Sequence, residues 1–434
     1  MDFAEIARYI FIGLFAVYTL VTYVGSTLHD RRALKGVYAI QNIITFAIHL
    51  IGYIILYLGA DDMKYIVLYI CEFALLFATI VVYDIVYPKA SRLLVNNMVI
   101  LEVVGFIFIT RINYDEGVRQ LVLAAIGTVI TFFVPAFLRN VKQMRNWGWA
   151  FAAIGFIALA IVPIFGRTVN GADLAIRIGD YTLQLSEFVK ILFVLFVASI
   201  FNRLRSFKQI LIVSGIAFAH IVILLVSRDL GTALIFFVAY VVMIYVATHK
   251  FYYLAAGVGI GLLGGFISSK VFSHVRSRIY AWRDPFKDYQ GSGWQIARSL
   301  FSIAAGGWIG VGLGKGLPSS IIHIENDMMF TAISEEMGGI VAIAILLICL
   351  NNLILMMGIA SRCNTLFYRL IAVGLGSMYG FQVFLTVGGA IKLIPLTGVT
   401  LPFVSYGGSS LIASLIVFAL INGMYTMREE QVTR

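Results

Sequence analysis

The segment 273–326 carries the densest group of side chains that could bind a ligand. Its basic residues are Arg276, Arg278, Arg283, Lys287, Arg298 and Lys315. They outnumber the three acidic residues of the same segment. Fixed positive charge attracts anionic ligands, and the glycines of QGSGW and GGWIGVGLGKG permit close approach of the backbone to a ligand. The segment therefore indicates an anion site, although a long loop can also carry such charge without a ligand.

Several acidic residues lie in or beside apolar stretches. Glu187 and Lys190 are three residues apart, so on a helix they can neutralise each other, and structural pairing is our first interpretation. Asn326 and Asp327 precede an apolar run, where both side chains suit the first turn of a helix and a carboxylate suits its dipole. From the residues alone, a helix cap is therefore the preferred interpretation of Asp327.

Protein-held metal and nucleotide sites are not indicated by the sequence. Cys71, Cys349 and Cys363 lie far apart, and the six histidines include no pair with helical i, i+4 spacing. The run GVGLGKG is not a phosphate-binding P-loop, because Lys315 is followed by glycine. We therefore expect neither a zinc site nor a disulfide framework. His49, Glu72 and Glu102 lie in apolar runs, where single polar residues commonly join helices.

The elements that must position these side chains are membrane helices. Of 434 residues, 61% are hydrophobic and 12% are charged, against about 45–50% and about 25% in ordinary soluble domains. Each helical span needs about 20 apolar residues. We expect an all-α polytopic membrane protein with thirteen spans, near 8–27, 37–59, 64–87, 93–112, 118–137, 147–166, 187–202, 209–226, 231–247, 251–272, 327–350, 367–390 and 408–427.

The distribution of charge predicts the orientation of the chain. The net charge is +10, but Lys and Arg gather in cytoplasmic loops for topological reasons, so nucleic-acid binding is not expected. Basic residues cluster in alternate short loops, for example at Lys89 and Arg92, and at Arg203 and Lys208. These loops are expected to be cytoplasmic. The N-terminus is then outside, the C-terminus is inside, and the long segment 273–326 is extracytoplasmic.

An ordered series of motifs from about residue 93 onward resembles the SEDS family of shape, elongation, division and sporulation proteins, which includes RodA, FtsW and SpoVE. The motifs are VNGA (169–172), QLSEFVK (184–190), SRDLGTA (227–233), QGSGWQIARSL (290–300), GGWIGVGLGKG (306–316), NDMMFTAISEEMG (326–338) and IPLTGVTLPFVSYGGSSL (394–411). The resemblance implies a ten-span core at 93–434. The three spans of 1–92 have no counterpart in the common family plan and form an extension.

The resemblance implies a function and a location. Family members are similar in being peptidoglycan glycosyltransferases, which polymerise lipid II at the outer face of the bacterial cytoplasmic membrane. A class B penicillin-binding protein is the expected partner. Asp327 corresponds to the family's essential extracytoplasmic aspartate, so the resemblance favours a general base that accepts the proton of the acceptor sugar's 4-hydroxyl.

A pyrophosphate leaving group needs positive charge close by to stabilise it. The candidate substrate-binding residues are Arg276, Arg278, Gln295, Arg298, Lys315, Lys392 and Ser405. The candidate structural or cavity-lining polar residues are Glu187, Lys190, Asp229, Glu335 and Glu336. A divalent cation, Mg²⁺ or Mn²⁺, would be held mainly by substrate phosphates, because the sequence lacks a clustered set of ligands.

Two departures from the family pattern leave other functions open. After VNGA the family usually has an Arg-Trp pair, whereas this chain has Asp173, Leu174 and Ala175, and Leu185 replaces the proline of a QPSE motif. A lipid II flippase would use the same cavity without chemistry. A catalytically silent scaffold would only position the penicillin-binding protein.

Overall fold

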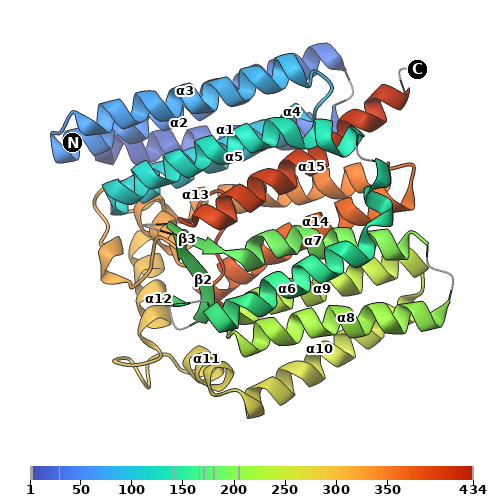
Figure 1. Ribbon diagram of the computed structural model, residues 1–434. Helices are drawn as coiled ribbons and strands as arrows, with labels where there is room; N and C mark the ends of the chain where they lie inside the picture. The colour runs from blue at the N-terminus through green and yellow to red at the C-terminus, as the bar shows by residue number, and fades with distance from the viewer. Residues whose placement is uncertain are drawn as a thin grey trace.

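The computed structural model describes residues 3–28, 30–140, 142–165, 167–169, 172–178, 181–203 and 206–432. Long helices lie side by side in a bundle (Figure 1). They are α1 (Phe3–Thr27), α2 (Arg31–Ala60), α3 (Lys64–Val86), α4 (Arg92–Ile112), α5 (Tyr114–Asn140), α6 (Gly148–Phe165), α7 (Leu185–Phe201), α8 (Phe207–Val226), α9 (Leu230–Thr248), α10 (Phe251–Val271), α13 (Met329–Ser361), α14 (Leu366–Ala390) and α15 (Gly408–Val432). The all-α polytopic membrane fold is confirmed.

Eleven helices in the described part of the chain are long and apolar enough to cross a membrane. The other two expected spans coincide with α6 and α7, which have 18 and 17 residues. Polar side chains mark several helix boundaries. Asp30 accepts hydrogen bonds from the backbone N–H groups of Arg32 and Ala33 at the start of α2, which satisfies donors that a helix leaves free.

Helices α1–α3, the expected extension, pack along one side of the remaining helices. Helix α1 contacts α13, α2 contacts α4, and α3 contacts α5. As a result, every residue in the most apolar window of α4 is buried inside the protein. Side-chain amides join the layers: Asn97 Nδ2 donates to Asn351 Oδ1 of α13 (3.2 Å), and Tyr18 of α1 donates to Asn97 Oδ1 (3.1 Å).

A buried polar cluster also fastens the extension. His49 of α2 and Glu72 of α3 are hydrogen-bonded at 2.9 Å, and Tyr53 donates to the same carboxylate at 2.7 Å. The Tyr53 hydroxyl also lies 3.2 Å from Thr110 of α4. This arrangement agrees with the interpretation that His49 and Glu72 join helices.

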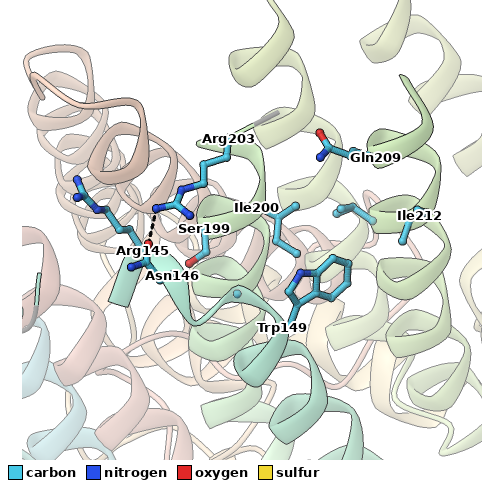
Figure 2. Close-up of a pocket in the computed structure, with 10 residues that line it drawn as sticks. Arg145, Asn146, Trp149, Ser199, Ile200, Arg203, Gln209 and Ile212 are labelled. Carbon is cyan, nitrogen blue, oxygen red and sulfur yellow. Dashed lines mark hydrogen bonds between the residues drawn. The ribbon is translucent and has the colours of Figure 1, made fainter. Parts of the chain in front are cut away.

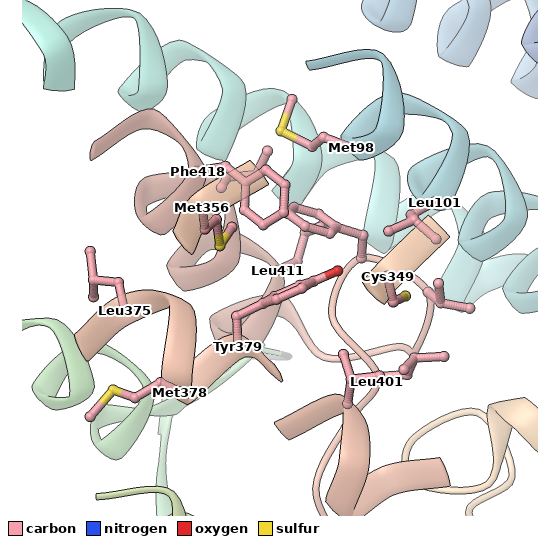
Figure 3. Packing of buried hydrophobic residues seen from close by; sticks show 14 of the residues in the cluster. Met98, Leu101, Cys349, Met356, Leu375, Met378, Tyr379, Leu401, Leu411 and Phe418 are labelled. Atoms are coloured by element: carbon pink, nitrogen blue, oxygen red, sulfur yellow. The ribbon is translucent and has the colours of Figure 1, made fainter. Parts of the chain in front are cut away.

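The core is a dense apolar cluster shared by helices far apart in sequence. Met98 and Leu101 of α4 lie near Cys349 of α13, Tyr379 of α14 and Phe418 of α15 (Figure 3). The Tyr379 and Phe418 rings meet edge to face at 5.4 Å between centroids, an arrangement that favours aromatic pairs. The last three long helices therefore form one packed unit with α4.

One end of the bundle carries the irregular structure (Figure 1). It contains α11 (Ser273–Arg283), α12 (Trp294–Gly306), the 3₁₀ turn Pro318–Ser320 and a three-stranded antiparallel sheet. The strands are β1 (Arg167–Val169), β2 (Ala172–Ile178) and β3 (Tyr181–Gln184), and Ile176 pairs with Leu183. The N-terminal end of α1 lies at this end of the bundle, and the C-terminal end of α15 lies at the other.

This small sheet differs from the loop that we expected at 167–186. Leu174, Ile176 and Ile178 alternate with other residues, a spacing of two that is typical of a strand. The substituted triplet Asp173–Ala175 is therefore part of β2. The VNGA motif falls partly outside the described residues, at 170 and 171.

Candidate functional site

Asp327 lies in the turn that leads from the segment 273–326 into α13. Its side chain is partly exposed. Gln295 of α12 donates from Nε2 to Asp327 Oδ1 at 3.2 Å and to the carbonyl of Ile322 at 3.1 Å. Helix α12 therefore positions the carboxylate through Gln295, a residue that the sequence identified as a substrate contact.

Helix α11 brings Arg278 to the same place. Its Nη1 donates to the carbonyls of Thr397 at 2.7 Å and Leu396 at 3.3 Å. Trp282, one turn later, donates from Nε1 to the carbonyl of Lys392 at 3.1 Å. Because residues four apart share a helix face, Arg278 and Trp282 together dock α11 onto the segment 391–400.

Gly398 lies between the carboxylate and the guanidinium. A Cβ built on Gly398 would be 3.7 Å from Arg278 Nη2 and 3.8 Å from Asp327 Oδ2. The glycine is exposed and has φ +76°, a conformation that glycine adopts readily and other residues rarely do. The carboxylate of Asp327 and the guanidinium of Arg278 therefore both lie beside the solvent-exposed backbone of Gly398.

The surroundings of Asp327 raise its pKa from 3.8 to about 6, because burial disfavours the charged carboxylate. Its own backbone N–H, Arg278 and His323 lower the pKa, and Glu325 raises it. Burial lowers the pKa of Arg278, and the negative charge of Asp327 opposes that change. The helix-cap interpretation has no support in the geometry, since Met328 is the N-cap of α13 and no side chain makes a capping hydrogen bond there.

His274 and Thr397 belong to this site and were missed in the sequence. His274 is on the same face of α11 as Arg278. Burial is the main cause that lowers the pKa of the His274 imidazole, and the positive charge of Arg278 lowers it further. His274 Nε2 and Thr397 Oγ1 are buried and have no hydrogen-bond partner among the described residues. Helical phase alone, with residues 274 and 278 four apart, would have placed His274 beside Arg278.

Two other candidate substrate residues lie close to the elements of this site. Arg298 is one turn beyond Gln295 on α12 and stacks over the Trp294 ring at 4.6 Å. Its Nε is buried and has no hydrogen-bond partner within the described residues. Lys392 is partly exposed, and its backbone has φ +61° in the turn after α14.

Three candidates are placed elsewhere. Arg276 donates to the carbonyls of Lys270 at 2.7 Å and Ser269 at 3.4 Å, at the end of α10, because two residues along a helix lead to nearly the opposite face. Lys315 lies 4.0 Å from Glu5 of the extension. Ser405 is buried, and its Oγ accepts a hydrogen bond from Leu401 N at 3.0 Å.

Buried polar side chains lie at the starts of α7 and α9. Glu187 and Lys190 form an ion pair at 2.7 Å, and Lys190 also donates to Gln382 Oε1 at 2.9 Å. Asp229 accepts hydrogen bonds from Ser186 Oγ at 3.3 Å and from Thr232 N at 3.0 Å, which caps α9. These side chains therefore bind one another and the ends of helices.

Glu335 and Glu336 hold the glycine-rich loop. Glu336 accepts from Gly314 N at 3.0 Å and Gly316 N at 3.1 Å, and it pairs with Arg111 at 3.3 Å. Glu335 Oε1 accepts from Leu317 N at 3.2 Å. Both glutamates therefore fix the loop 306–317 against α13.

Helix α13 is broken at Gly338, where φ is 85° and ψ is 167°. The loop completes the broken hydrogen-bond ladder. Val311 N donates to the carbonyl of Glu335 at 3.0 Å, and Gly339 N donates to the carbonyl of Gly307 at 2.9 Å. Backbone groups that the break would leave unsatisfied in a membrane are thus paired.

The described residues include no group of three or more His, Cys, Asp or Glu side chains that could hold a metal ion. Around Asp327 the side chains that carry charge are Arg278, His323 if protonated, and Glu325. This arrangement offers one carboxylate base, one fixed cation and an open position between them. It suits proton transfer beside an anionic ligand.

Comparisons with known proteins place the chain in a family. The model of the FtsW/RodA/SpoVE cell cycle proteins matches residues 91–430. The peptidoglycan glycosyltransferase RodA of Mycobacterium tuberculosis is 30% identical over 365 residues, which cover 77% of each chain. Stage V sporulation protein E of Bacillus subtilis is 34% identical over 319 residues, covering 70% of this chain and 85% of that relative.

Solved structures share the fold. A chain from a structure described as showing coordination of polymerization and crosslinking by a peptidoglycan synthase complex has a TM-score of 0.68 and 24% identity, over 78% of this chain and 98% of that one. Thermus thermophilus rod shape determining protein RodA has a TM-score of 0.60 and 23% identity, over 79% and 98%. The family model covers most of the sequence, so this chain belongs to the FtsW/RodA/SpoVE family of cell cycle proteins.

Proposed function

We propose that the chain is a peptidoglycan glycosyltransferase that polymerises lipid II, with Asp327 as general base. The relatives named as peptidoglycan glycosyltransferases support the reaction class. The observation that carries the residue assignment is that Asp327 Oδ2 and Arg278 Nη2 both lie beside the exposed backbone of Gly398. A partly exposed carboxylate beside a fixed cation fits a proton acceptor next to an anionic substrate.

In this mechanism the 4-hydroxyl of the acceptor sugar attacks the anomeric carbon of the donor. A new C–O bond forms as the bond to undecaprenyl pyrophosphate breaks, and the bonding electrons leave with the pyrophosphate. Asp327 accepts the hydroxyl proton. Attack opposite the leaving group converts an α-linked donor into a β-1,4 product. A base with a pKa of about 6 is largely ionised at neutral pH and still accepts a proton readily.

Arg278 stabilises negative charge on the leaving group, and Arg298 and Lys392 provide further positive charge for the pyrophosphate. A divalent cation, Mg²⁺ or Mn²⁺, would be held mainly by the substrate phosphates; the described residues include no group of three or more His, Cys, Asp or Glu side chains that could hold a metal ion. When bound, such a cation neutralises pyrophosphate charge. Gln295 positions Asp327 through its hydrogen bond.

The core at 93–434 carries this activity, and the extension at 1–92 covers α4. The protein lies in the bacterial cytoplasmic membrane with its N-terminus outside and its C-terminus inside, which places Asp327 at the outer face. The charge of the short loops supports this orientation. A class B penicillin-binding protein is the partner, in keeping with the fold shared with a chain of a peptidoglycan synthase complex.

The test is Asp327→Asn, which is nearly isosteric but a far weaker base. Purified protein, with and without its partner, is incubated with labelled lipid II, and the products are separated on a gel. Asp327→Asn should abolish polymer while Asp284→Asn, an exposed acid at the end of α11, should leave it unchanged. Full polymer from Asp327→Asn would refute the base assignment.

The same assay separates the two alternative functions. A lipid II flippase would form no glycan chain in detergent and would move lipid II equally well with Asp327→Asn. A silent scaffold would yield no polymer from the wild-type protein even with its partner. Polymer that requires the partner but disappears with Asp327→Asn identifies an activated enzyme.

A further inference from the structure

A pocket of ≈230 Å³ lies among the ends of α6, α7 and α8, at the opposite end of the bundle from α11 and α12 (Figure 1). It is formed by the 3₁₀ helix η1 (Lys142–Asn146), the first residues of α6, the end of α7 and the first turns of α8 (Figure 2). Gly148 permits this close approach, because a Cβ there would lie 2.8 Å from Ile200 and 2.9 Å from Ser199. The pocket is therefore a built feature at the junction of three helices.

The polar side of the pocket is positively charged. Arg145 and Arg203 line it, and Arg203 Nη2 donates to Asn146 Oδ1 at 2.5 Å. None of the described lining residues is acidic, and no described acidic side chain forms an ion pair with either arginine. Trp149, in the first turn of α6, also lines the pocket, so the positive end of that helix dipole adds to the field.

The other side of the pocket is apolar and exposed. In Figure 2 the two arginines lie on one side of the pocket, and Trp149 and Ile212 lie on the other. Trp149 is 56% exposed and Ile212 is 45% exposed. In a membrane protein, tryptophan at a helix end commonly sits at the level of the lipid head groups. A ligand of this pocket must therefore carry a negatively charged group for the arginines and an apolar part for Trp149 and Ile212.

We propose that this pocket binds the phosphate of an anionic glycerophospholipid, with Arg145 and Arg203 on the phosphate and the acyl chains against Trp149 and Ile212. Arginine recognises phosphate with paired N–H donors. The volume is below the about 300–1,000 Å³ of pockets that enclose whole small molecules, so it accommodates a head group whose chains remain in the bilayer. Basic pockets between membrane helices are typical sites for anionic lipid head groups.

The test uses native mass spectrometry of the purified full chain titrated with phosphatidylglycerol or with phosphatidylcholine. Phosphatidylglycerol should bind in preference to phosphatidylcholine. The double variant Arg145→Ala/Arg203→Ala should lose about 25-fold in apparent affinity for phosphatidylglycerol, about fivefold for each arginine. Arg362→Ala removes an exposed arginine from the loop before α14 and is the matched control. The double lysine variant should lose less affinity than the double alanine variant, because it keeps both charges but not the paired N–H donors.

Each outcome bears on the lipid site. Equal binding of the two lipids, or equal phosphatidylglycerol binding by the double alanine variant and Arg362→Ala, would overturn the proposal. In a separate arm, inorganic phosphate at a tenfold molar excess should not displace the lipid. Displacement would assign the pocket to free phosphate instead. Loss of lipid by the control to the same extent as by the double variant would show a general surface effect and would also overturn the site.

Discussion

At the residue scale, the site depends on charge that is partly removed from water. Burial raises the pKa of Asp327, and Arg278 works against that increase. A carboxyl group whose folded-state pKa is raised binds its proton more tightly in the folded protein than in the unfolded chain. Stability therefore falls as the pH rises from about 3.8 to about 6, and the full cost of ionising Asp327 is present above that range, a cost that an active-site base commonly carries.

This balance predicts the pH dependence of polymerisation. With a pKa of about 6 for Asp327, activity should fall about tenfold per pH unit below that value, as the base becomes protonated. Arg278→Gln removes the cation that lowers this pKa, so the acidic limb should move to higher pH by about one unit. Arg278→Lys keeps the positive charge, so the acidic limb of its pH–rate profile should lie at the same pH as in the wild-type protein. Initial rates measured from pH 5 to 8 test this, and an unmoved limb in Arg278→Gln would contradict the coupling.

Some residues that the sequence predicted for this site do lie together in the structure, and others were grouped with them only because they are close in sequence. Asp327 and Gln295 were identified from motifs and Arg278 from the basic character of the segment 273–326, and they do lie together. Arg276 was grouped with Arg278 because both are basic, but α11 turns the two side chains to different faces. The role of Gly398 was not predictable, because it depends on a turn about 70 residues from Asp327 in the chain.

At the element scale, α13 and the glycine-rich loop form one unit. The motifs GGWIGVGLGKG and NDMMFTAISEEMG are separate segments of the sequence. In the structure their backbones are hydrogen-bonded to each other at the break at Gly338. Periodicity alone predicts a continuous apolar span here. The Gly338–Gly339 pair is a local signal that permits a break, but the pairing that stabilises it was not predictable, because its hydrogen bonds come from another segment.

Gly338→Ala should unfold this unit. The new Cβ would lie 2.4 Å from Gly310 N, at a backbone φ of 85° that alanine rarely adopts. We expect a loss of about 3 kcal/mol or more, from strain and overlap together. Gly358→Ala, in the same helix with nothing within 4 Å of the added Cβ, is the matched control and should be neutral or stabilising. Thermal unfolding in detergent measures both, and equal midpoints would contradict the role of the break.

At the scale of the whole molecule, the two ends of the bundle carry different structural features. Helices α11 and α12 and the small sheet lie at one end, and the ends of α6, α7 and α8 that form the pocket lie at the other (Figure 1). The sequence predicted this sidedness from loop charge, since alternate loops are basic. It did not predict how the extension packs, because apolar helix faces have no distinctive spacing for a particular partner.

Cysteine labelling tests the proposed orientation. Lys287→Cys lies in the segment between α11 and α12, and Lys250→Cys lies between α9 and α10; both positions are exposed. In intact cells a membrane-impermeant maleimide should label the Lys287→Cys variant. The Lys250→Cys variant should be labelled only after the membrane has been permeabilised. The background should replace Cys71, which is exposed, with serine. The reverse pattern would invert the topology and place Asp327 on the cytoplasmic side.

The enclosure of α4 has a consequence for how the protein is made. This helix carries Asn96, Asn97 and Glu102 buried in its apolar surface, which bare lipid would solvate poorly. Translation delivers α1 and α2 before α4, so Gln41, which accepts a hydrogen bond from Asn96 at 3.0 Å, is already in the bilayer when α4 leaves the ribosome. The leading helices thus act as an intramolecular insertion chaperone for the first helix of the catalytic core.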